Sequence, residues 1–322
     1  MSPAIAGIIG IGLLVVLFLL RMPIAFSMAL AGFAGFAYLT TPGAALNLLG
    51  LDIFESFSSY PLSVIPMFIL MGTFAFASGI SQRLYGTAYA WIGHYRGGLT
   101  IATVLACAAF GAICGSSTAT AAIMGKIALP EMKKYKYDDA LATGTVAAAG
   151  TLGILIPPST IFIVYGILTE QSIGKLFVAG VLPGILLMIL FAATVALLCW
   201  RKPAIGPAGA PSTWKEKLKA LTGIFEALLL FLVAIGGLFL GWFSPTQAGA
   251  IGAGGALVIG LARRQLSWHT FIEACREGLQ TSCMVIFIIT GAIIFGHFMA
   301  VSRIPFMLAE WLGGFPYTRW PS

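Results

Sequence analysis

Long apolar runs separated by short polar segments most restrict how this chain folds. A helix needs about 20 apolar residues to cross a bilayer. Candidate runs occupy 4–20, 23–40, 62–80, 99–115, 160–174, 176–200, 221–243, 246–262 and 279–301. Hydrophobic residues fill 59% of the 322 positions and charged residues only 9%, whereas a soluble domain has about 25% charged residues. The sequence therefore predicts an all-α integral membrane protein.

Two segments between the fourth and fifth runs break this pattern. The piece at 116–130 is too short to cross easily, and 138–157 runs into Pro157 and Pro158. Proline lacks a backbone N–H and disfavours the helical conformation of the residue before it. Non-helical backbone at membrane depth is tolerated only where protein or a water-filled cavity satisfies it. We therefore predict a re-entrant hairpin over 111–132 and a broken helix over 138–174.

The distribution of basic residues predicts the orientation. With the N-terminus outside and the hairpin re-entrant, only Lys175, Arg303 and Arg319 of the 18 Lys and Arg residues fall on the outer side. The 41–60 segment, with Asp52 and Glu55, is then an outer loop. Segment 201–220 combines Pro, Gly and Lys residues, which predicts a cytoplasmic linker followed by an interfacial helix.

The predicted hairpin tip carries Gly115-Ser116-Ser117-Thr118. Hydroxyl oxygens replace the hydration shell of a cation or hydrogen-bond a carboxylate. A helix that begins at Ser116 or Ser117 also points its positive dipole end at an anion. The alternative is that these hydroxyls only pack between helices and bond to carbonyls of their own chain.

The break between Gly150 and Pro158 is expected to free the carbonyls of Gly150, Thr151, Gly153 and Ile156 from helical hydrogen bonds. Secondary transporters coordinate Na⁺ with such carbonyls and meet anionic substrates with half-helix N-termini. Ser159 and Thr160 are predicted to cap the second half-helix. A proline kink without a ligand is the alternative. The predicted Na⁺ site comprises Ser116, Ser117, Gly150, Gly153, Ile156 and Pro157.

One block within 115–184 reads GSSTATAAIMGKIALPEMKKYKYDDALATGTVAAAGTLGILIPPSTIFIVYG. It resembles the large membrane subunit of tripartite ATP-independent periplasmic (TRAP) transporters, the DctM-like family of the ion-transporter superfamily. The resemblance extends through RMPIAFSMAL and YPLSVIPMFILMG to HFMAVSRIPFMLAEWL. It implies an inverted-repeat elevator fold in the bacterial inner membrane and Na⁺-coupled uptake of an organic acid such as a C4-dicarboxylate or sialic acid. It also implies a small four-helix membrane subunit and a periplasmic binding protein as partners.

The resemblance also suggests how the chain is divided. We expect scaffold helices over 1–98, a first transport repeat over 99–200, the linker over 201–220 and the start of a second repeat over 221–322. Such subunits normally continue through a second hairpin and a second broken helix. We therefore expect the second repeat to be incomplete here, and the chain as printed not to transport.

Substrate contacts are expected from Ser116, Thr118 and Ser159 at the two broken elements, with weaker candidates in Ser172 and Arg303. At position 303, the arginine pairs with a substrate carboxylate or, alternatively, extends to the membrane interface. Ser172 is a candidate for the outer end of the cavity. Asp138 and Asp139 are expected to open a helix, where carboxylates suit the helix dipole.

Other classes of function lack their motifs. The chain has no GxxxxGK[ST], HExxH or GxSxG sequence, which argues against ATP hydrolysis and proteolysis. Its five cysteines lack metal-ligand spacing, and His94, His269 and His297 form no proton-relay pattern. We predict no enzyme activity and no cofactor beyond Na⁺ as coupling ion. The remaining alternatives are a binding-protein-independent Na⁺/dicarboxylate carrier of the same superfamily and, more remotely, an intramembrane enzyme.

Overall fold

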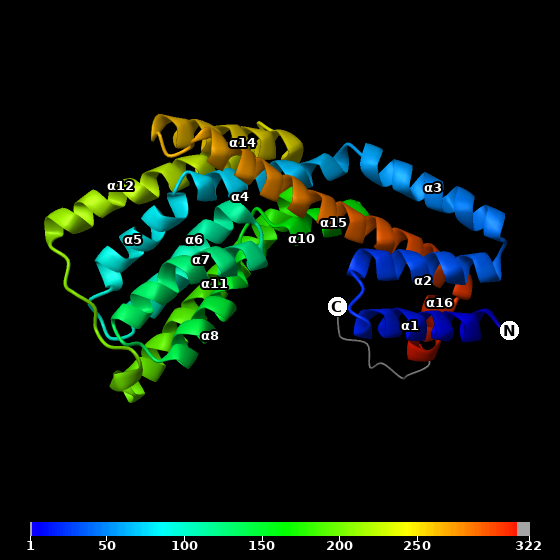
Figure 1. Ribbon diagram of the computed structural model, residues 1–322, viewed down its shortest axis with the longest axis horizontal. Helices are drawn as coiled ribbons and strands as arrows, with labels where there is room; N and C mark the ends of the chain where they lie inside the picture. Colours follow the sequence, from blue (N-terminus) through cyan, green and yellow to red (C-terminus); the bar gives the residue numbers. More distant parts are fainter. Residues whose placement is uncertain (1, 314–322) are drawn as a thin grey trace, which may run out of the picture. The chain divides into compact units, whose positions relative to one another are not determined.

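The computed structural model describes residues 2–313, and every regular element within that range is helical (Figure 1). The chain divides into two compact units. Unit 1 comprises Met1–Leu62 and Thr281–Ser322, and unit 2 comprises Ser63–Gln280. Helix α15 (Trp268–Ser302) begins in unit 2 and ends in unit 1. The predicted all-helical class is confirmed for the described residues.

Unit 1 is built from apolar helices that meet through glycines. Its helices are α1 (Pro3–Leu19), α2 (Ile24–Leu39), α3 (Pro42–Ser58), the second part of α15, and α16 (Ile304–Gly313). Phe298 of α15 is fully buried against Gly10 of α1 and Gly35 of α2, where an added Cβ would clash with its ring. Gly32 of α2 lies directly on the backbone of Phe295. Small residues let these helices approach closely, which replaces the hydrophobic driving force that is absent between helices in lipid.

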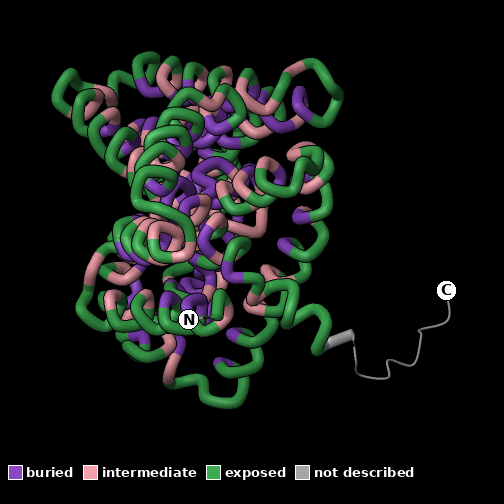
Figure 2. Tube along the Cα trace, turned by 90° about the vertical axis from the view of Figure 1, so that its right-hand side faces the viewer, coloured by how far each residue is buried: buried purple, intermediate pink, exposed green. Residues whose placement is uncertain are grey.

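Unit 2 surrounds one deeply buried helix, α6. Of its residues, Ala102, Phe110 and Ile113 are among those that are almost completely enclosed. Helices α4, α5, α7, α8 and α11 all pack on α6. Figure 2 shows how buried and exposed residues alternate along the helices. The helices of this unit are α4 (Val64–Ala77), α5 (Ile80–Ile92), α6 (Gly98–Cys114), α7 (Ser117–Lys134), α8 (Asp139–Gly150), α9 (Leu152–Leu155), α10 (Thr160–Leu168), α11 (Ile173–Arg201), α12 (Trp214–Phe231), α13 (Gly237–Phe239) and α14 (Pro245–Ala262), with short elements η1 (Pro61–Ser63), η2 (Pro203–Ile205) and the π-helical η3 (Leu232–Gly236).

Helices α4 and α14 show the same small-residue packing as unit 1. A Cβ on Gly249 would lie 2.8 Å from Cβ of Met67, and Gly252 faces the Met71 side chain. The Ser78 hydroxyl at the end of α4 donates a hydrogen bond of 3.0 Å to the Ala256 carbonyl of α14. Glycine in α14 thus positions the helix against α4 by removing side-chain bulk.

By length and composition, five helical segments of the described chain are able to cross a membrane, or six if α3 and α4 form one span. These are Asp139–Leu168, Ile173–Arg201, Trp214–Phe239, Pro245–Ala262 and Trp268–Ser302. The predicted runs 4–20, 23–40 and 99–115 form shorter apolar helices, Pro3–Leu19, Ile24–Leu39 and Gly98–Cys114. The chain is therefore a multi-pass membrane protein.

Two sequence predictions about elements are wrong, and one further helix was not predicted. The 41–60 segment is not a loop, because α3 occupies Pro42–Ser58 with Thr41 as its N-cap. The segment after the third run contains α5, whose polar and aromatic residues conceal its helical character. The run at 160–174 is not one helix, since α10 ends at Leu168 and Ser172 begins the long α11.

The predicted linker between the halves is bound to the helical bundle. The Gly97 N–H donates to the Gly206 carbonyl at 2.8 Å, and the Gly209 N–H donates to the Gly93 carbonyl at 2.8 Å. The Asp138 N–H, at the start of α8, donates to the Ile205 carbonyl at 3.0 Å. The linker and the turn between α7 and α8 must therefore lie on the same side of the membrane.

Cysteine labelling tests this arrangement together with the predicted orientation. On a background without native cysteines, exposed positions Lys134→Cys and Ala208→Cys should react with an impermeant maleimide only after permeabilisation. Ser58→Cys should react in intact cells, because the charge distribution places α3 outside. Labelling of Lys134→Cys and Ala208→Cys from opposite sides would contradict the structure. Labelling of both from outside would instead contradict the orientation alone.

Candidate functional site

The sequence Cys114-Gly115-Ser116 turns the chain from α6 into α7, which folds back against α6. Gly115 has φ +66°, in the left-handed region that favours glycine. A Cβ there would also lie 2.5 Å from the Pro158 carbonyl oxygen. Ser116 is the N-cap of α7, and its Oγ accepts the Ala119 N–H at 3.4 Å. The prediction of a helix that begins at Ser116 or Ser117 is confirmed.

The second broken element lies where the glycines and prolines predicted it. Helix α8 ends at Gly150, the one-turn helix α9 ends at Leu155, and Ile156 adopts an extended conformation. Helix α10 then begins at Thr160, and the fully buried Ser159 caps it by accepting the Phe162 N–H at 3.4 Å. The predicted cap is confirmed for Ser159, whereas Thr160 is the first residue of α10 and does not cap it. The expectation of a free Thr151 carbonyl is wrong, because the Ile154 N–H donates to it at 3.3 Å.

The hairpin tip and the broken helix are in direct contact. The Gly115 carbonyl accepts two hydrogen bonds from Thr160, from the N–H at 3.3 Å and from the hydroxyl at 3.1 Å. Gly111 of α6 lies on the backbone of Gly153, where a Cβ would be 2.8 Å from the Gly153 Cα. Two elements that the sequence predicts separately therefore form one site.

Oxygen atoms surround Gly153 in this site. A Cβ on Gly153 would lie 2.6 Å from Thr120 Oγ1 and 2.7 Å from the Ser116 carbonyl oxygen. Thr120 is fully buried, and apart from the weakly polar Cys114 thiol beside it, Oγ1 has no hydrogen-bond partner among the described residues. Buried polar atoms normally have partners. The Ser116 carbonyl already accepts the Thr120 N–H at 3.0 Å and has a second lone pair. This carbonyl and a hydroxyl whose partner is only a thiol, with no side chain between them, suit a small cation that takes oxygen ligands.

The other predicted Na⁺ ligands occupy less open positions. Gly150 packs on Ala121 of α7, where a Cβ would be 2.6 Å from the Ala121 Cβ, so its lack of a side chain serves helix contact. Ile156 faces Gly184 of α11, and Pro157 is buried. Ser117, the first residue of α7, is half-buried.

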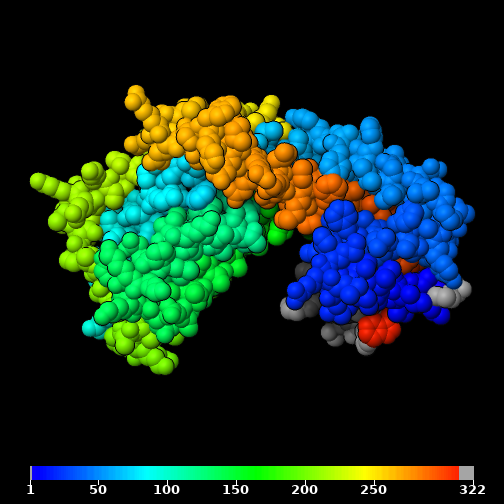
Figure 3. Space-filling view, in the orientation of Figure 1, coloured from blue at the N-terminus to red at the C-terminus, as the bar shows by residue number. Residues whose placement is uncertain are grey.

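In the space-filling view, green side chains of α7 and α8 form much of the front surface of unit 2 (Figure 3).

Two helix N-termini meet at the Gly115–Thr160 contact. Helix α7 starts at Ser117 with its cap at Ser116, and α10 starts at Thr160 with its cap at Ser159. The exposed Thr118 hydroxyl lies 3.2 Å from Ser116 Oγ. The first N–H groups of a helix and its dipole favour an anion. The arrangement therefore offers positive potential beside the two oxygens that approach Gly153.

Two predicted substrate residues are not brought to this contact. Ser172 caps α11 by accepting the Lys175 N–H at 3.5 Å, and it lines a separate cavity of about 340 Å³ with Lys175, Val178 and Phe239. Arg303 belongs to unit 1, where it is exposed and adopts φ +59° between α15 and α16. Both residues stay predictions. Asp138 does cap α8, since its Oδ1 accepts the Leu141 N–H at 3.0 Å.

Sequence reasoning missed Thr120 and two charged groups that the fold buries. Thr120 follows Ser116 by four residues, which places both on one face of the helix, so helical spacing was a usable signal. Glu226 of α12 is contacted by Arg83 and Arg263, and Asp52 of α3 is contacted by His297. No spacing signal connects these pairs, because their members are distant in the sequence.

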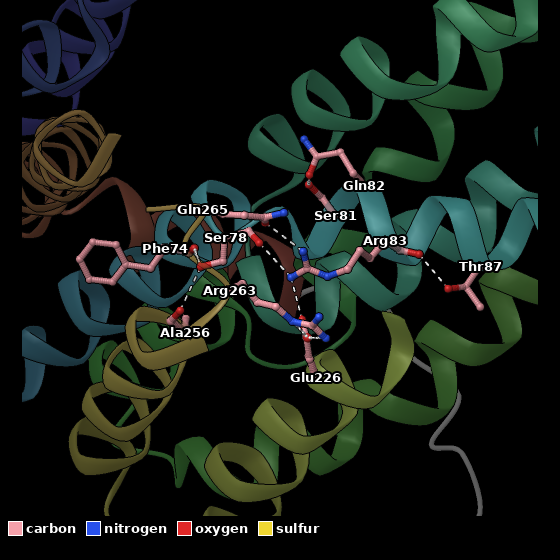
Figure 4. Close-up of polar contacts among 10 residues, drawn as sticks. All are labelled: Phe74, Ser78, Ser81, Gln82, Arg83, Thr87, Glu226, Ala256, Arg263 and Gln265. Atoms are coloured by element: carbon pink, nitrogen blue, oxygen red, sulfur yellow. Dashed lines mark hydrogen bonds and ion pairs between the residues drawn. The ribbon is translucent and has the colours of Figure 1, made fainter. Parts of the chain in front are cut away.

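The Glu226 cluster joins three helices of unit 2 (Figure 4). Arg83 Nη2 of α5 lies 2.7 Å from Glu226 Oε2, and Arg263 at the end of α14 contacts Oε1. Arg83 also donates to the Ser78 carbonyl at 2.8 Å and to Gln265 Oε1 at 3.0 Å. Because its charges bind one another, we interpret the cluster as a structural clamp and not as a ligand site.

Comparison with known proteins supports the membrane-transport interpretation. The family model of the tripartite ATP-independent periplasmic transporter, DctM component, matches residues 11–320. The chain is 37% identical over 277 residues to the C4-dicarboxylate TRAP transporter large permease protein DctM of Pseudomonas aeruginosa, which covers 86% of this chain and 64% of the relative. It is 33% identical over 322 residues to the protein of the same description from Rhodobacter capsulatus, covering 94% and 71% respectively.

A third relative carries a different substrate in its name. The sialic acid TRAP transporter large permease protein SiaM of Vibrio cholerae is 32% identical over 293 residues, which are 90% of this chain and 67% of the relative. The chain thus spans roughly two thirds of the length of these relatives. The family is one of transporter permeases and not of enzymes. The chain therefore belongs to the DctM family of large permease components of tripartite ATP-independent periplasmic transporters.

Proposed function

We propose that this sequence forms the part of a large permease subunit that binds Na⁺ and couples it to uptake of an organic acid. The contact between the hairpin tip and the broken helix carries this proposal. It places the Ser116 carbonyl and the Thr120 hydroxyl around Gly153, and it places two helix N-termini beside them. Half-helix ends of this kind serve cation and carboxylate binding in secondary transporters.

The substrate is proposed to be a carboxylate, either a C4-dicarboxylate or an acidic sugar such as sialic acid. Its anionic group would approach the capped ends of α7 and α10, with Thr118 and Ser159 as hydroxyl contacts. Arg303 stays a proposed substrate contact. A small membrane subunit and a periplasmic binding protein are proposed as partners, since relatives with this family match are named as components of TRAP transporters. Elevator movement of the hairpin and broken helix remains a part of this proposal.

Uptake measurements test the proposal on a complete large subunit that carries this sequence. With the small subunit and a loaded binding protein in liposomes, uptake should depend on an inward Na⁺ gradient. Ser117→Ala should raise the Na⁺ concentration for half-maximal uptake several-fold, because it removes one candidate ligand but leaves the Ser116 cap in place. Thr222→Ala serves as the control, since that hydroxyl is exposed on α12 and bonds only to the Lys219 carbonyl at 2.8 Å.

The outcomes separate the alternatives. Unchanged Na⁺ dependence in Ser116→Ala, Ser117→Ala and Thr120→Val would reject the Na⁺ site. Uptake that does not need the binding protein would favour a binding-protein-independent carrier of the same superfamily.

A further inference from the structure

A carboxylate in unit 1 is buried with one of its oxygens unpartnered. Asp52 of α3 is 4% exposed, and its Oδ1 lies 3.2 Å from Nε2 of His297 on α15. Oδ2 has no hydrogen-bond partner in the described part of the chain. One turn along α3, the Ser56 hydroxyl is equally buried and likewise without a partner between residues 2 and 313. Buried polar groups normally have partners, so this face of α3 carries a carboxylate that the described residues compensate only in part.

Energetics favours a positive ligand at this place. A buried carboxylate without compensation is costly, because no water replaces the hydration that the charge has lost. The imidazole of His297 is the one group in contact with the carboxylate that changes its charge near neutral pH. Its side chain is 43% exposed, so it reaches the surroundings while its Nε2 reaches Asp52. The His297 ring is therefore less enclosed than the carboxylate that it contacts.

The neighbouring helices offer no other cation to this carboxylate. Helix α2, which packs on α3, contains Tyr38 as its sole titratable side chain. The unit 1 part of α15 adds only Cys283 besides His297. Glu55 on the next turn of α3 is exposed and has the same sign of charge as Asp52. A proton on the imidazole is therefore the positive charge that these elements provide.

We propose that Asp52 and His297 form a proton-binding site of unit 1, separate from the Na⁺ site proposed in unit 2. A proton from water binds the neutral imidazole, and the resulting imidazolium donates its Nε2–H to Asp52 Oδ1. The pair changes from a net charge of −1 to zero, with no other bond made or broken. The ligand is the proton itself, and Asp52 is the residue that retains it.

Nuclear magnetic resonance of the detergent-solubilised protein tests this site. The chain has three histidines, so ¹⁵N-histidine labelling produces few ring signals, and His297→Gln identifies the relevant one. The titration of the His297 ring is then compared between the unmodified protein and the Asp52→Asn variant. In Asp52→Asn the ring should bind the proton at least about tenfold more weakly, since a carboxylate nearby shifts titration by one unit or more. Ser58→Ala is the control and should leave the His297 titration unchanged, because this exposed hydroxyl near the end of α3 donates to the Phe54 carbonyl at 2.7 Å.

The possible outcomes each decide the matter. Equal titration of the His297 ring in the unmodified protein and in a folded Asp52→Asn variant overturns the proposal. A shift of the His297 signal on adding Na⁺ at constant pH would show a metal-cation site instead of a proton site. None of these results depends on Na⁺ binding in unit 2, which is measured separately.

Discussion

Alanine at Gly153 should raise the Na⁺ concentration needed for half-maximal effect by at least about tenfold, a loss of about 1.4 kcal/mol of binding free energy. The added Cβ would lie 2.6 Å from Thr120 Oγ1 and 2.7 Å from the Ser116 carbonyl oxygen, so it would occupy the space between the proposed oxygen ligands. Thermal unfolding of the purified chain at increasing NaCl, with KCl at equal ionic strength as reference, measures the effect directly. A bound ligand stabilises the folded state in proportion to ln(1 + [L]/Kd).

Gly144→Ala provides the matched control for this experiment. Gly144 lies on α8, and a Cβ at that position meets no heavy atom within 4 Å. Alanine is a better helix former than glycine, by about 1 kcal/mol in a helix interior. The control should therefore keep the full Na⁺ response and lose no stability. An equal Na⁺ response in Gly153→Ala and Gly144→Ala would remove Gly153 from the site.

Alanine at Glu226 should destabilise the folded state by about 3–5 kcal/mol, the largest effect on stability that we expect of any single substitution here. Glu226 is 8% exposed, and its single negative charge contacts both Arg83 and Arg263. Without it, Arg83 would remain largely buried with its Nε already unpartnered in the described residues. Urea unfolding in detergent, followed by tryptophan fluorescence, measures the change.

Glu131→Gln is the control for the Glu226 prediction. Glu131 lies 4.0 Å from Lys134, and the two side chains are exposed on α7. An exposed pair of this kind contributes about 0–1 kcal/mol. A loss in Glu226→Ala no greater than in Glu131→Gln would mean that the cluster does not clamp α5, α12 and α14 together.

Local backbone chemistry made the two broken elements predictable. Gly115, Ser116, Pro157 and Pro158 restrict φ, remove donors and cap helices within a few residues of themselves, so the sequence alone indicates where α7 and α10 begin. The position of the Thr120 hydroxyl beside the Ser116 carbonyl was not predictable in the same way. It depends on Gly153 approaching from a segment more than thirty residues away, which only the folded structure shows.

Helices α3 and α5 were not predicted for a different reason. Helix α3 contains Asp52 and Ser56, and α5 contains Ser81 and Arg83, so neither has the continuous apolar run that identifies a span. Their polar residues face partners on other helices, such as His297 for Asp52 and Glu226 for Arg83. In the sequence these polar residues suggest a loop, whereas in the fold they contact residues of other helices. Sequence patterns do not contain those tertiary contacts.

The hydrogen-bonded linker holds the start of the second half of the chain close to the first half. Gly209 is fixed to Gly93, and Thr213 caps α12 only four residues later. Four residues extend over at most about 14 Å. The start of α12 therefore stays at a high effective concentration near the end of α5, where the Trp91 indole donates to the Lys217 carbonyl at 3.3 Å. Docking of α12 on α5 is in this respect a nearly local event, although the two helices are separated by more than one hundred residues of sequence.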